Sequence, residues 1–299
     1  MRITPNSTAY NALYNIQQSR AKLDSLQEQV ASGYNYNRPS DDPVMTNLLL
    51  TTNDSLKTNE QHQTNITKAS TWLNMTNTAL QGMSDTVAQA KKLMATIGSG
   101  SSDQSVLQSA VSQLTALRQQ LADMGNTQLQ GQYIFSGAKS STQPFDRDIQ
   151  SAPYSGTYYN GDSTVNKVQI DTSATENLNL TGDQVLTGPD VNILQEMDKL
   201  ITAVGNNDVT GIQQGAKNLE KGATQIENAQ STVSARVSRL DSASSMLTTS
   251  KNTLETIIGD NQNADYTKLA VQLSLQQTAF EASLSATAKI SQMSLLDYL

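Results

Sequence analysis

Residues 66–97 read ITKASTWLNMTNTALQGMSDTVAQAKKLMATI, and in them apolar residues recur every seven positions. A companion set follows three residues after each member of the first. The first set is Ile66, Leu73, Leu80, Val87 and Met94, and the second is Ala69, Thr76, Met83, Ala90 and Ile97. This is the a/d spacing of a helix that packs along other helices. The pattern therefore predicts a long helix with one buried seam.

The predicted helix extends from about residue 44 to residue 97. Residues 44–143 contain no proline, the strongest helix breaker. Gly98 and the serines after it are expected to end the helix, and Asp103 or a nearby serine to cap the next one. Together the two helices form the predicted first half of a helical rod, residues 44–131.

A second proline-free segment carries the same kind of seam. Its apolar positions, again seven apart, are Ile212, Leu219, Ile226, Val233, Leu240, Leu247 and Leu254. A shorter helix over about 193–204 is expected before it. Residues 189–258 are thus the predicted second half of the rod. The predicted fold class is mainly α, a long antiparallel helical bundle with a small β insert.

The insert is expected over residues 132–188. This segment contains four of the ten tyrosines and two of the three phenylalanines. Asn160-Gly161 is the typical sequence of a type I′ hairpin turn. Residues 164–170 alternate apolar and polar side chains, as a half-buried strand does. We expect a small β-rich domain that projects outward.

Each end of the chain is predicted to be an amphipathic helix, within residues 1–43 and 259–299. The apolar faces of these two helices are not part of the central seams. We therefore expect the two helices to pack in an assembly and to be loosely ordered in the free monomer. The candidate assembly residues are Ile16, Leu23, Leu26 and Val30 at the N-terminal end and Leu269, Leu273, Phe280, Leu284, Leu295 and Leu296 at the C-terminal end.

The composition argues against enzyme chemistry. The chain has no cysteine and a single histidine, His62, which excludes thiol catalysis and makes a histidine-based metal site or triad improbable. His62 is expected on the solvent side of the long helix. The net charge of −7 argues against nucleic-acid binding. We find no segment apolar enough for membrane insertion and no apolar core of a cleavable secretion signal. We expect no catalytic residues, no cofactor and no metal.

One turn carries a family resemblance. Its residues are Ser32, Gly33, Arg38, Pro39, Ser40, Asp41, Asp42 and Pro43. The turn resembles the N-terminal signature of bacterial flagellins and their relatives. The runs GQYIFSG at 131–137, YNGD at 159–162 and SLLDYL at 294–299 are similar to those of the hook-associated protein 3 family of hook–filament junction proteins. The two aspartates are expected to serve the turn and the start of the next helix rather than a cation.

The resemblance implies a structural protein of the bacterial flagellum, secreted by the flagellar type III export apparatus and located outside the cell. It implies self-assembly into a ring, with hook-associated protein 1 and flagellin as neighbours and an export chaperone as a transient partner. The terminal helices would form an inner tube, the rod an outer wall and the insert the exposed surface. The alternatives are a flagellin filament subunit and a secreted coiled-coil effector or adhesin.

Overall fold

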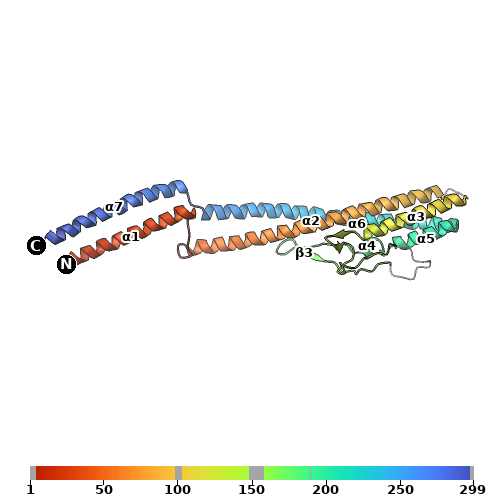
Figure 1. The fold of residues 1–299 in the computed structure, drawn as a ribbon, viewed down its shortest axis with the longest axis horizontal. Coiled ribbons are helices and arrows are strands. Elements are labelled where there is room, and N and C mark those ends of the chain that lie inside the picture. Colours follow the sequence, from red (N-terminus) through yellow and green to blue (C-terminus); the bar gives the residue numbers. More distant parts are fainter. Residues whose placement is uncertain (1–4, 98–102, 148–157, 189, 297–299) are drawn as a thin grey trace. The chain divides into compact units, whose positions relative to one another are not determined.

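The computed structural model describes residues 5–97, 103–147, 158–188 and 190–296 (Figure 1). The chain divides into two compact units. Residues 1–58 and 249–299 form the terminal unit, and residues 59–248 form the central unit. Two long helices contribute residues to both units.

Helices dominate the described residues, as the sequence predicts. They are α1 (Pro5–Ser32), α2 (Pro43–Ile97), α3 (Gln104–Gly125), α4 (Gly182–Val185), α5 (Ile193–Gly205), α6 (Val209–Gln262) and α7 (Tyr266–Leu296). The prediction of a helix over 44–97 is confirmed by α2, and that of a helix over 193–204 by α5. Asp103 caps α3, because its carboxylate accepts a hydrogen bond of 2.9 Å from the backbone N–H of Ser105.

The predicted seams form the core of the central unit. Leu73, Leu80 and Val87 of α2 are fully buried, as are Leu219 and Val233 of α6. They belong to one apolar cluster that also includes side chains of α3 and α5. Along this core α2 and α6 run antiparallel: Asn59 donates to the Leu247 carbonyl at 3.1 Å, and Gln230 donates to the Gln81 side chain at 2.8 Å. The mainly α, antiparallel bundle is confirmed.

The described part of the chain contains two short antiparallel strand pairs, one within the insert and one at its start, whose first strand lies before residue 132. Strand β1 (Gln128–Leu129) pairs with β2 (Gln132–Tyr133), and β3 (Lys167–Gln169) pairs with β4 (Thr175–Asn177). The buried residues of the insert, Phe135 and Phe145 among them, join the same apolar cluster as the helices. The Gln225 side chain of α6 donates to the Val185 carbonyl at 2.7 Å, which joins the end of the insert to the bundle.

The predicted hairpin at Asn160-Gly161 is wrong. A type I′ turn needs positive φ at both central residues, and neither residue has it. Tyr159 packs instead on Phe145, with ring centroids 5.5 Å apart. The N–H of Asn160 donates to the carbonyl of Pro144, a residue outside any hairpin. These tertiary contacts outweigh the local turn preference. The two-residue turn with positive φ at both central residues lies instead at Gln130 and Gly131, between β1 and β2.

The prediction of a solvated His62 is also wrong, because only 6% of the residue is exposed. His62 lies seven residues before Ala69, and Asn59 lies seven before Ile66, so the two continue the seam of α2 with polar side chains. Both are buried. Heptad position therefore decided burial here, and side-chain polarity did not.

Candidate assembly surface

The two terminal helices lie side by side within the terminal unit (Figure 1). A small apolar cluster joins them near the end of α1 and the start of α7. Leu26, Leu269 and Ala264 are buried in it, and Val30 and Leu273 pack against it. Four of the predicted assembly residues are therefore brought together within one chain.

The seam continues with weaker burial beyond this cluster. The Gln276 amide donates to the hydroxyl and the carbonyl of Ser19, at 2.9 and 3.0 Å. Ile16, Leu23 and Phe280 are half-buried. Leu284 is exposed. The side chains of Leu295 and Leu296 fall outside the described residues, and the role of all these positions in subunit contacts stays a prediction.

A second group of apolar side chains on α1 and α7 faces away from the seam. These outer apolar residues are Tyr10, Leu13, Tyr14, Val271 and Leu275, each of them exposed. Tyr10 is 69% exposed and Leu275 66%. None of these five residues is among the assembly residues predicted from the sequence. The signal was the spacing of four between Tyr10 and Tyr14 and between Val271 and Leu275, which places each pair on one helix face.

The outer apolar residues lie in uncharged stretches of sequence. Residues 3–19 and 269–280 contain no Asp, Glu, Lys or Arg. These stretches therefore have no charged side chains that could attract a partner electrostatically. Recognition there depends on apolar contact and on neutral hydrogen-bonding groups such as Asn and Gln.

The signature turn is stabilised by its own two aspartates. Asp42 caps α2, because its carboxylate accepts from the N–H groups of Val44 and Met45 at 3.0 and 2.9 Å. The Asp41 carboxylate accepts from the N–H of Arg38 at 2.9 Å and from that of Asn37 at 3.2 Å. The expected role of these aspartates in the turn and the helix start is confirmed.

The other signature residues have mainly backbone roles. Pro43 is the first residue of α2, where a missing N–H costs nothing. Gly33 has φ of +77°, which favours glycine. Ser32 accepts from the N–H of Tyr34 at 3.2 Å. Pro39 and Ser40 are exposed. The Arg38–Glu28 ion pair has an N–O distance of 3.2 Å and side chains 67% and 45% exposed, so it contributes little to stability.

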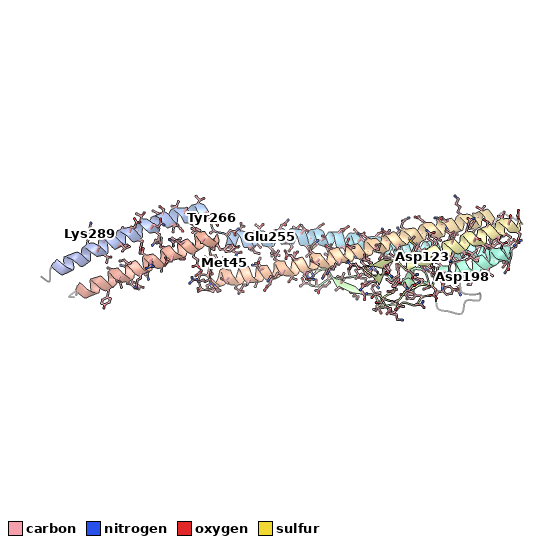
Figure 2. The ribbon with its side chains drawn as sticks, viewed as in Figure 1. Met45, Asp123, Asp198, Glu255, Tyr266 and Lys289 are labelled. Atoms are coloured by element: carbon pink, nitrogen blue, oxygen red, sulfur yellow. The ribbon has the colours of Figure 1, made fainter. Side chains whose placement is uncertain are left out.

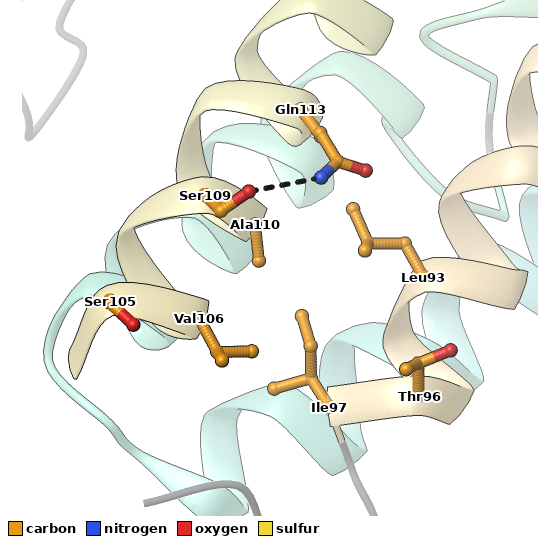
Figure 3. Close-up of a pocket in the computed structure, with 8 residues that line it drawn as sticks. All are labelled: Leu93, Thr96, Ile97, Ser105, Val106, Ser109, Ala110 and Gln113. Atoms are coloured by element: carbon orange, nitrogen blue, oxygen red, sulfur yellow. Dashed lines mark hydrogen bonds between the residues drawn. The ribbon is translucent and has the colours of Figure 1, made fainter. Parts of the chain in front are cut away.

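The central unit has a groove between the end of α2 and the start of α3 (Figure 3). Its volume is about 500 Å³. Leu93, Ile97, Val106 and Ala110 point into it, and Gln113 donates to Ser109 at its rim with a distance of 3.2 Å. No charged side chain lines this groove among the described residues.

The described ranges contain no group of three or more His, Cys, Asp or Glu placed to hold a metal ion. Over the same ranges, every helix is too short or too polar to cross a membrane. Figure 2 shows the charged residues Asp123, Asp198, Glu255 and Lys289 spread along the helices.

Comparison with known proteins places this architecture among flagellar proteins. The chain is 26% identical over 199 residues to flagellar hook-associated protein 3 of Salmonella typhimurium. It is 25% identical over 199 residues to the protein of the same name from Escherichia coli K12. Each alignment covers 66% of this chain and 61% of the relative, so the chain spans somewhat less than two thirds of the curated relatives it matches.

Solved structures share the fold. A protein from Vibrio parahaemolyticus described as a flagellar hook-associated protein aligns with a TM-score of 0.68 at 23% identity, over 75% of this chain and 100% of that one. The flagellar junction protein FlgL from Legionella pneumophila aligns with a TM-score of 0.59 at 16% identity, over 72% of this chain and 100% of the other. At these identities the likeness shows the fold alone.

Two family models of the bacterial flagellins match, one in the N-terminal half of the chain and one at its C-terminal end. Residues 3–140 match the bacterial flagellin N-terminal helical region. Residues 216–299 match the bacterial flagellin C-terminal helical region. The chain therefore belongs to the bacterial flagellin family.

Proposed function

We propose that this protein is a structural axial component of the bacterial flagellum that joins the hook, through hook-associated protein 1, to the flagellin filament. The family membership and the relatives named hook-associated protein 3 support a flagellar role. The name hook-associated protein 3 of the curated relatives motivates the position next to the hook, and the flagellar junction protein FlgL shares the fold.

The observation that carries the proposal is the exposure of the outer apolar residues. Tyr10, Tyr14 and Leu275 are large, mostly exposed and located on two paired helices. Exposed apolar side chains gathered on one element mark an interaction site in a soluble protein. Copies of the same chain, together with hook-associated protein 1 and flagellin, are the proposed partners. The seam residues Leu26 and Leu269 serve this surface by holding its two helices together.

The remaining roles follow the predicted segments. In the proposed assembly, residues 1–43 and 259–299 line the inner tube. The rod halves, 44–131 and 189–258, form its outer wall, and residues 132–188 form the exposed surface. The chain reaches the outside through the flagellar type III export apparatus, with an export chaperone on the C-terminal helix, and it acts without an enzymatic activity.

A complementation experiment tests the proposal. The triple variant Tyr10→Ser, Tyr14→Ser, Leu275→Ser replaces three outer apolar side chains without touching the buried seam. In a strain that lacks the gene, it is expected to leave cells non-motile, with unpolymerised flagellin in the medium. Met246→Ser is the matched control, since Met246 is 71% exposed on α6, and it is expected to restore motility. Restored motility with the triple variant, secreted in normal amounts, would contradict the proposal.

The alternatives give different results in two further measurements. A flagellin filament subunit polymerises into long filaments when the purified protein is seeded, whereas a junction protein stops at a ring. A secreted effector or adhesin binds its target after residues 1–40 and 260–299 are deleted. The proposed junction protein loses incorporation at the hook tip after either deletion.

A further inference from the structure

A second groove of the central unit lies between α2 and α6 and is polar. Its volume is about 220 Å³. The Gln63 amide of α2 donates to the Ser244 hydroxyl of α6 at 2.6 Å, which joins the two helices at one wall of the groove. Hydroxyl and amide side chains and one carboxylate make up most of its lining, which consists of Ile66, Thr67, Ser70, Thr71, Asn74, Asp241 and Ser244. We call these residues the hydroxyl groove.

The threonine hydroxyls of the hydroxyl groove are left as hydrogen-bond acceptors. Thr67 donates its hydroxyl proton to the Gln63 carbonyl, and Thr71 donates its own to the Thr67 carbonyl, both at 2.9 Å. A hydroxyl has one proton to donate, so these two oxygens offer only lone pairs to a bound group. Asn74 uses one of its N–H groups on the Ser70 hydroxyl, at 3.3 Å. The α2 wall of the groove is therefore rich in acceptors.

The carboxylate of Asp241 makes the hydroxyl groove negative. Asp241 is exposed on α6, and its side chain has no hydrogen-bond or ion-pair partner in the described part of the chain. Charged residues at the edge of a helical seam often form an ion pair with the facing helix. Here the facing wall carries Thr67, Thr71 and Asn74, and no Lys or Arg of the described ranges lines the groove. The groove thus combines a negative charge and several acceptors with no positive charge of its own.

We propose that the hydroxyl groove binds the guanidinium group of an arginine side chain from a partner protein. A guanidinium is planar and always positive, and it carries five N–H donors and no acceptor. Two parallel hydrogen bonds to the Asp241 carboxylate leave N–H groups for the oxygens of Thr67 and Thr71. A lysine ammonium, a compact point charge with three donors, matches acceptors spread over two helices less well. This site is separate from the outer apolar residues, and the inference does not depend on the proposed place in the flagellum.

A titration of the full-length, ¹⁵N-labelled protein followed by NMR tests the inference. The probe is N-acetyl-L-arginine amide, which presents arginine as it occurs within a chain. It is expected to shift the backbone amide resonances of residues 66–74 and 241–244 saturably. N-acetyl-L-citrulline amide has nearly the same shape without the charge, and it should bind at least about tenfold more weakly. Tighter binding of free L-arginine than of the blocked probe would contradict a partner protein as the source.

Matched variants locate the binding site. Asp241→Asn removes the charge with little change of shape and should weaken binding of the arginine probe at least about tenfold. Asp54→Asn, at an exposed position of α2 outside the groove, should leave binding unchanged. Thr71→Val removes one acceptor and should weaken binding about threefold. Thr78→Val is its control, because the Thr78 hydroxyl makes the same kind of bond, to the Asn74 carbonyl, outside the groove.

Three results would overturn the inference. The first is a citrulline probe that binds as tightly as the arginine probe. The second is an Asp241→Asn protein that keeps the parent's affinity. The third is an equal loss of affinity in Asp241→Asn and Asp54→Asn, since that would mean that the probe responds to the overall negative charge of the chain and not to this groove.

Discussion

Arg118 of α3 and Asp198 of α5 form an ion pair with an Nε–Oδ1 distance of 3.1 Å, and the Arg118 side chain is only 1% exposed. The same guanidinium donates from Nη1 to the carbonyls of Asp146 and Arg147, both at 2.7 Å. One buried side chain thus joins two helices and a segment of the insert. Burial raises the pKa of Asp198, although the charge of Arg118 acts in the opposite direction.

Arg118→Met is expected to lower the free energy of unfolding by about 3–5 kcal/mol, because it leaves the Asp198 carboxyl buried without its arginine. Urea unfolding followed by circular dichroism measures the change. Arg147→Met is the control, since the Arg147–Asp123 pair has side chains 60% and 49% exposed, and it should cost no more than about 1 kcal/mol. Equal losses of unfolding free energy in the two variants would show that the buried Arg118 pair contributes no more to stability than the exposed Arg147 pair.

The stability that the contact between the insert and α6 contributes should depend on pH. Arg239 donates to both carboxylate oxygens of Glu176, at 2.8 and 3.0 Å. These hydrogen bonds lower the pKa of Glu176, against the opposing effect of its burial. The folded state therefore binds this proton less readily than the unfolded state. The stabilisation is complete above the unfolded pKa of about 4.3 and is lost as the pH falls through the lower folded value.

Glu176→Gln is the variant that isolates this effect. At pH 7 it should be less stable than the parent by about 1–2 kcal/mol, a figure reduced for the exposure of Arg239. The gap should close as the pH falls below about 4, because the parent then also carries a neutral side chain at position 176. Urea unfolding from pH 3 to pH 7 measures this difference in unfolding free energy. A difference that stays constant over this range would contradict a stabilising ion pair at Glu176. Effects of other groups, Asp198 included, are common to both proteins and cancel.

Close packing of α6 on α5 makes a further prediction. A Cβ on Gly215 would collide with the Leu200 side chain. Gly215→Ala gains about 1 kcal/mol of helix propensity but should lose about 1–3 kcal/mol through overpacking, so a net lower melting temperature is expected. Gly205→Ala is the control: its Cβ would meet Val111 at 3.8 Å, an ordinary contact, and the variant should be neutral or slightly stabilised. A Gly215→Ala protein that melts higher than the parent would argue against the close contact.

Much of the bundle could be predicted because its helices repeat a heptad pattern. Leu73, Leu80, Leu219 and Val233 are at predicted seam positions and fully buried. The hairpin error had a tertiary cause, since Tyr159 packs on Phe145 and removes Asn160 from the expected turn. A local signal could not anticipate a contact made by another part of the insert.

The candidate site was only partly predictable. The helical spacing of the apolar residues at each end, Leu26 and Leu269 among them, correctly indicated an apolar face on each terminal helix. It could not show that these two faces meet, because they lie more than 200 residues apart in the sequence. Tyr10 and Val271 lie outside the predicted stripe of their helices, which is why the sequence pattern did not indicate them. Once that stripe is buried against the other helix, the remaining apolar side chains are the ones left exposed.

His62 gives the last prediction. It occupies a seam position of α2, and neither ring nitrogen has a hydrogen-bond partner among the described residues. Burying an unpaired polar group costs about 1–3 kcal/mol, and an apolar side chain of similar size avoids that cost. His62→Leu is therefore expected to raise the free energy of unfolding by about 1–2 kcal/mol. His62→Gln keeps a polar side chain in the seam and should bring no such gain. Urea unfolding of both variants decides the matter, because a destabilised His62→Leu protein would mean that the imidazole makes a favourable polar contact in the folded chain.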